Sequence, residues 1–115
     1  METTEIRVVF LKVLTESLES AANLGYVDDN PASAIEEALP NFYTNRKNPG
    51  HEEYLALYTL VDYWADSFDH GFTHLFGIQP PISVDEARGL LEIAVKNLQS
   101  DEPVTDPRIL KWADV

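Results

Sequence analysis

The chain of 115 residues contains no cysteine. Disulfide bonds, thiolate metal ligands, iron–sulfur clusters and a thiol nucleophile are therefore excluded, and the core must hold without covalent cross-links. This composition fits a reducing compartment, and we expect the protein to be cytoplasmic. No stretch reaches the roughly 18 apolar residues of a membrane span, and the apolar run from Ile6 to Leu14 is interrupted by Arg7 and Lys12.

Glycine is also scarce, and the five glycines stand singly along the chain. Glycine-rich phosphate loops and dinucleotide fingerprints do not occur, and neither do serine nucleophile elbows or EF-hand loops. The usual motifs of acyl and phosphoryl transfer are thus missing. We predict a protein without catalytic activity and assign no catalytic residue.

Positive charge is missing from one long region, since no Lys or Arg lies between Asn48 and Ala87. The same region holds seven carboxylates: Glu52, Glu53, Asp62, Asp66, Asp69, Asp85 and Glu86. The whole chain has 20 Asp and Glu against 8 Lys and Arg, and its formal net charge is −12. This charge argues against direct binding of nucleic acid or a membrane surface, and it favours a cationic protein surface or a divalent cation.

Apolar residues recur every three or four positions in three long segments, which is the pattern of amphipathic helices. These segments are Thr4–Leu24, His51 to about His70, and Ser83 to about Gln99. A shorter helix before Pro40 and a last turn or two from Pro107 complete the prediction. We expect an all-α protein, a compact bundle of four main helices plus a short C-terminal helix, forming a single domain over residues 1–115.

Two starts compete for the short second helix. Asn30 can cap a helix that has Pro31 at its first position, whereas Ser33 and Glu36 form a capping box three residues later. The other boundaries have one set of signals each: Gly25 after the first helix, Ser83 with Glu86 before the fourth, and Asp106 with Pro107 before the last. The last helix is too short to be stable alone and must dock on the bundle or on another molecule. Gly71 leaves open whether the central helix continues beyond His70.

The central helix carries the candidate binding residues. At about 100° per residue, Tyr63 is predicted on its polar side beside Asp66 and His70. Tyrosine is favoured in interfaces because it brings a large area with little rotamer entropy. The expected partner-binding set is Glu52, Glu53, Asp62, Tyr63, Asp66 and Asp69. A structural explanation also stays open, because carboxylates stabilise helix starts and acidic surfaces improve solubility.

The leading functional hypothesis is a small acidic, non-catalytic binding protein whose anionic face occupies a basic site on a partner protein. One concrete form is an inhibitor or immunity-type protein that mimics the charge of nucleic acid. A first alternative is a divalent-metal protein that uses Asp66, His70 and His74; otherwise no cofactor is expected. A second alternative is a structural or regulatory subunit, such as a homodimer formed through Val8 and Leu11 on the first helix.

Overall fold

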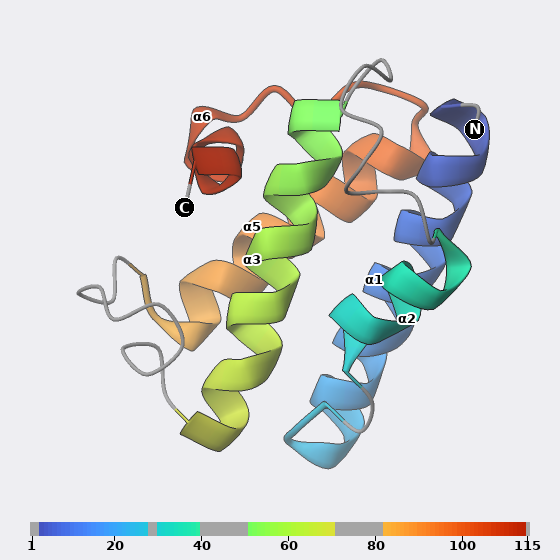
Figure 1. The fold of residues 1–115 in the computed structure, drawn as a ribbon. Coiled ribbons are helices and arrows are strands. Elements are labelled where there is room, and N and C mark those ends of the chain that lie inside the picture. Colours follow the sequence, from blue (N-terminus) through green and yellow to red (C-terminus); the bar gives the residue numbers. More distant parts are fainter. Residues whose placement is uncertain (1–2, 28–29, 40–50, 71–81, 115) are drawn as a thin grey trace.

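All described secondary structure is helical. The computed structural model describes residues 3–27, 30–39, 51–70 and 82–114, with side chains described at 5–27, 30–39, 51–66 and 82–113. The elements are α1 (Thr3–Leu24), α2 (Pro31–Ala38), α3 (His51–His70), α5 (Val84–Gln99), α6 (Pro107–Leu110) and the 3-10 turn η1 (Lys111–Asp114) (Figure 1). No strand occurs in these residues. The predicted fold class, four main helices plus a short C-terminal helix, is confirmed.

The helix α2 begins at Pro31, so the first of the two competing starts is the one used. The Asn30 side-chain oxygen accepts hydrogen bonds from the backbone N–H groups of Ala32 (2.9 Å) and Ser33 (3.4 Å). These N–H groups have no partner inside the helix, and Pro31 has no N–H to satisfy. The helix ends at Ala38, ahead of the proline that was predicted to stop it.

The other helix boundaries also follow their local signals. The Ser83 hydroxyl oxygen accepts the N–H of Glu86 at 3.1 Å, and Asp106 accepts the N–H of Arg108 at 2.9 Å. At the end of α1, Gly25 has a φ of +77° and donates its N–H to the carbonyl oxygen of Ala21 at 2.9 Å. Glycine suits this position because other residues rarely adopt a left-handed backbone.

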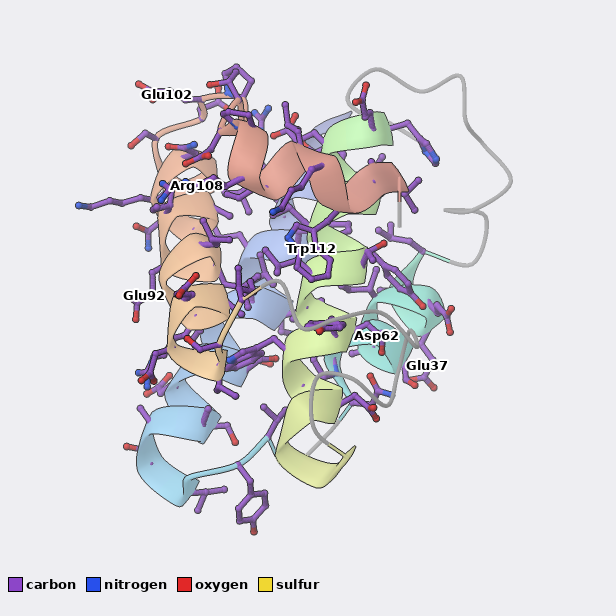
Figure 2. All side chains as sticks on the ribbon, turned by 90° about the vertical axis from the view of Figure 1, so that its left-hand side faces the viewer. Glu37, Asp62, Glu92, Glu102, Arg108 and Trp112 are labelled. Carbon is purple, nitrogen blue, oxygen red and sulfur yellow. The ribbon has the colours of Figure 1, made fainter. Side chains whose placement is uncertain are left out.

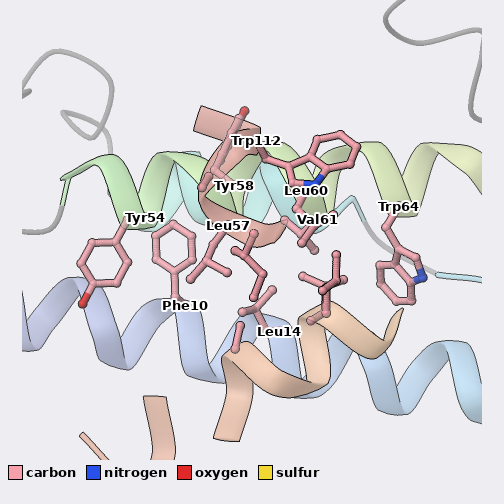
Figure 3. Close-up of a cluster of buried hydrophobic side chains, with 14 of the residues drawn as sticks. Phe10, Leu14, Tyr54, Leu57, Tyr58, Leu60, Val61, Trp64 and Trp112 are labelled. Atoms are coloured by element: carbon pink, nitrogen blue, oxygen red, sulfur yellow. The ribbon is translucent and has the colours of Figure 1, made fainter. Parts of the chain in front are cut away.

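The helix α3 is the central element and packs against α1, α2, α5 and the C-terminal segment. Its predicted apolar stripe is confirmed at Leu57, Val61 and Trp64, which are fully buried. Figure 3 shows Leu57 and Val61 on the same side of α3 as Phe10 and Leu14 of α1, with Trp64 farther along α3. Burying a Leu, Val or Phe side chain completely stabilises a fold by roughly 1.5–3 kcal/mol.

The C-terminal segment closes the core by packing along α3, as its short length required. Ile109 of α6 and Trp112 of η1 are both buried, and Val104 is buried in the connection before them. Of the two predicted alternatives, docking on the bundle or on another molecule, the structure shows docking on the bundle. This packing covers a side of α3 that the helical periodicity assigned to solvent.

Candidate functional site

Four carboxylates from α2 and α3 form one acidic surface, defined here as Glu36, Glu37, Asp62 and Asp66. Figure 2 shows Glu37 and Asp62 on the same side of the molecule, and α2 packs directly on α3. Glu36 and Glu37 are exposed, whereas Asp62 and Asp66 are half-buried. The surface thus joins residues that are far apart in the sequence.

The pKa of the Asp62 carboxyl is raised by its surroundings in the acidic surface. Burial raises the pKa of its carboxyl, and the neighbouring carboxylates of Asp66 and Glu36 raise that pKa further. Like charges at close range disfavour the ionised form, so the acidic surface opposes its own ionisation. At neutral pH this repulsion lowers the free energy of unfolding.

Tyr58 holds one member of the surface in place. Its buried phenol donates a hydrogen bond of 2.5 Å to a carboxylate oxygen of Glu36, across the contact between α3 and α2. A hydrogen bond to an ionised carboxylate is stronger than one between neutral groups. Glu36 is therefore tied to α3 by this hydrogen bond, although its side chain is exposed.

The cations of the described residues stand on other elements. Arg7 and Lys12 lie on α1, and the remaining four are Arg88, Lys96, Arg108 and Lys111 on α5, α6 and η1. By sequence, α2 carries two carboxylates and α3 carries five, and neither helix contains Lys or Arg. Described ion pairs join Arg7 to Asp101, Arg88 to Glu92, and Arg108 to Asp106.

The two glutamates at the start of α3 differ in their surroundings. Glu52 is exposed in the first turn, where its charge favours the helix N-terminus. Glu53 instead accepts the backbone N–H of Val104 at 2.7 Å, and burial raises the pKa of its carboxyl, against the opposing effects of that hydrogen bond and of Arg7. At 100° per residue it lies about 180° from Asp62 around the helix. Glu53 therefore does not belong to the acidic surface.

The predicted position of Tyr63 on the polar side of α3 is wrong. Tyr63 is fully buried, and its ring packs against the indole of Trp112 with centroids 4.8 Å apart. The docked η1 turn supplies this cover. As a buried side chain Tyr63 is not available to anchor a partner in the described fold.

The remaining candidate residues lie outside the described side chains. These are Asp69 and His70, whose backbone alone is described, and His74, which lies in the undescribed segment that also contains Gly71. Among the described residues, no group of three or more His, Asp or Glu side chains could hold a metal ion. The alternative of a metal bound by Asp66, His70 and His74 stays a prediction.

Glu36 and Glu37 were not among the residues predicted for partner binding. No local pattern links α2 to α3, because the two carboxylates that meet, Glu36 and Asp62, are separated by 26 positions. The only available signal was the absence of Lys and Arg from both helices. It identifies the sign of the surface, and the packing of α2 on α3 determines which carboxylates share it.

Comparison of the chain with protein-family models, with curated proteins and with solved structures gave no match. Within the described residues, no helix combines the length and apolar character that crossing a membrane requires. The function must therefore be inferred from the residues and geometry of this chain.

Proposed function

We propose that this protein is a non-catalytic binding protein whose acidic surface on α2 and α3 occupies a basic site on another protein. The observation that carries the proposal is the meeting of Glu36, Asp62 and Asp66 where α2 packs on α3, two helices that contain no Lys or Arg. Burial raises the pKa of the Asp62 carboxyl, and the nearby carboxylates of Asp66 and Glu36 raise it further. Evolution retains a destabilising cluster more readily where binding benefits from it. The cysteine-free composition fits a cytoplasmic partner.

The mechanism is electrostatic. The carboxylates of Glu36, Glu37, Asp62 and Asp66 meet Lys and Arg side chains of the partner, which speeds association and makes it sensitive to salt. Glu52, in the first turn of the same helix, adds a further carboxylate. Asp69, whose side chain lies outside the described ones, stays part of the predicted set. Where the basic site normally binds phosphate, the protein acts as an inhibitor that mimics the charge of nucleic acid.

Capture from native lysate tests the proposal. Immobilised wild-type protein is compared with a variant carrying Asp62→Lys and Asp66→Lys. We expect a basic protein that the wild type retains, that high salt elutes, and that the variant fails to retain. The matched control carries Glu16→Lys and Glu19→Lys on α1, which makes the same change in net charge at two exposed positions.

The control should retain the partner at close to the wild-type level, with the small loss that a lower net charge produces. Equal retention by the wild type and by the Asp62 and Asp66 variant contradicts the proposal. The inhibitor form makes a further demand, because added double-stranded DNA must compete with the immobilised protein for the captured partner. If a partner is captured but DNA does not compete for it, the binding proposal is retained and the hypothesis of nucleic-acid mimicry is rejected.

A further inference from the structure

The outward face of α5 has a glycine at its centre. Glycine in a helix interior is destabilising relative to alanine, and one use that offsets this cost is to let another group approach the backbone closely. A Cβ atom built at Gly89 would meet no atom within 4 Å. Among the described residues, nothing in the packing of this chain requires glycine at that position.

Two hollows lie on either side of this glycine, and both are lined by Gly89 and Ile93. The larger, of about 460 Å³, lies toward α6 and has Ile82 and Leu90 in its wall. The smaller, of about 310 Å³, lies toward α1 and is lined by Leu18. Charged and polar side chains complete both linings: Glu86, Arg108 and Lys111 in the larger hollow, and Glu92, Lys96 and Gln99 in the smaller. The exposed side of α5 is therefore apolar around Gly89 and Ile93, with charged residues around it.

The residues along this face can pair with the same residues of a second, antiparallel α5. At 100° per residue, Glu86, Gly89, Ile93 and Lys96 fall within about 80° of one another around the helix. The pair Glu86 and Lys96 and the pair Gly89 and Ile93 are each centred on position 91. A second α5 lying antiparallel across the first would therefore set Gly89 against Ile93 and Glu86 against Lys96, and each contact would occur twice.

We propose that two copies of this chain associate through α5, antiparallel and with two-fold symmetry. Gly89 allows the helices to approach closely, and Ile93 of each copy enters the hollow beside Gly89 of the other. Glu86 and Lys96 are exposed, and no described residue of the same chain forms an ion pair with either. Each can thus form an ion pair with the other copy.

The distribution of charge favours this face over the others. Two chains of charge −12 repel each other, so association needs a surface where negative charge is offset. Half of the eight Lys and Arg lie on α5, α6 and η1, namely Arg88, Lys96, Arg108 and Lys111. Figure 2 places Glu92 of α5 on the opposite side of the molecule from Glu37 and Asp62. The proposed dimer therefore leaves the acidic surface open, and it does not depend on the proposed function.

Sedimentation equilibrium over a wide range of protein concentration tests this proposal. The weight-average mass of the wild type should rise from 13.0 kDa toward twice that value. Glu86→Lys and Lys96→Glu should each prevent the rise, because each sets two like charges against each other twice. The double variant exchanges the two charges and should dimerise again. Gly89→Gln should also keep the protein monomeric, since its side chain fills the hollows beside position 89.

Matched controls separate the contact from net charge and from folding. Glu5→Lys lies in the first turn of α1, as Glu86 lies in that of α5, and Lys12→Glu is an equivalent exposed reversal. Both should dimerise, and circular dichroism should show the same helix content in every variant. A wild type that stays at the monomer mass overturns the proposal. A dimer that persists in Glu86→Lys and in Lys96→Glu also overturns it, because its interface then lies elsewhere. A double variant that stays monomeric overturns it as well.

Discussion

The indole of Trp112 packs against the phenol ring of Tyr63 with ring centroids 4.8 Å apart and ring planes inclined at 53°. Both side chains are almost completely buried, although Trp112 is three residues from the last residue of the sequence. Tilted aromatic pairs of this kind contribute about 0.5–1.5 kcal/mol beyond the burial of their area. This contact therefore helps to attach the C-terminal segment to α3.

Replacing Trp112 with alanine should lower the free energy of unfolding by about 3–5 kcal/mol, the usual cost of removing a buried aromatic ring. The segment comprising α6 and η1 should also become accessible to protease, because four-residue helices are not stable alone. Urea denaturation and limited proteolysis measure the two effects. Lys111→Ala, at an exposed neighbouring position, is the control and should change stability by less than about 0.5 kcal/mol. An equally small effect of Trp112→Ala would contradict the structural role of the pair.

Helix boundaries were predictable from the sequence because capping contacts join residues two or three positions apart. Ser83 and Asp106 cap the helices that their local patterns indicated, and Asn30 is the one of two competing starts that the structure uses. The orientation of Tyr63 was not predictable in the same way. Helical periodicity assumes one buried and one solvated side, whereas α3 is packed by helices on several sides and by the docked C-terminal segment.

Some features of the acidic surface were likewise predictable from the sequence, whereas others depend on tertiary packing. Composition alone predicted a negative field near α3, and the spacing predicted that Asp62 and Asp66 lie one turn apart. The contribution of Glu36 depends on how α2 crosses α3, and this contact leaves no pattern within one helix. The exclusion of Glu53 was available from the sequence, because 100° per residue puts it about 180° from Asp62. The hydrogen bond between Glu53 and Val104 was not.

Replacing Asp62 with asparagine should stabilise the protein at neutral pH. The substitution removes the like-charge pair with Asp66 one turn away, which costs about 0.2–0.5 kcal/mol, and the repulsion from Glu36 adds to this gain. Glu52→Gln is the matched control on the same helix. It should destabilise by about 0.3–1 kcal/mol, because it removes a favourable charge from the first turn. Urea denaturation of both variants checks the opposite signs, and a loss of stability in Asp62→Asn would contradict the repulsion.

The stability should depend on pH in a direction set by Asp62 and Glu53. Both carboxyls have a pKa raised by folding, so the folded state binds more protons than the unfolded state between the two pKa values. Their contribution to stability is fully present below the ordinary carboxyl pKa of about 4 and is lost as pH rises through the folded pKa. The advantage of Asp62→Asn over the wild type should therefore shrink on acidification toward pH of about 4.

Asp106 provides the opposite case for the same experiment. Its hydrogen bonds with Arg108 lower the pKa of the Asp106 carboxyl, so its stabilising contribution is present above the ordinary pKa and is lost as pH falls through the folded value. Asp106→Asn should be less stable than the wild type at neutral pH, with a deficit that shrinks in strong acid. Urea denaturation across a pH series compares the two variants. Parallel curves for Asp62→Asn and the wild type would show that Asp62 titrates alike in both states.

The two described glycines should respond oppositely to alanine. At Gly89 the added methyl group meets open space within a helix, so Gly89→Ala should stabilise the dilute monomer by about 0.5–1 kcal/mol. At Gly25 the backbone φ of +77° is unfavourable for any L side chain, so Gly25→Ala should destabilise it by about 1–2 kcal/mol. Thermal unfolding monitored by circular dichroism at low protein concentration measures both. If Gly89→Ala destabilises the monomer, the glycine serves the fold of the single chain, and the explanation given for its presence on the face of α5 fails.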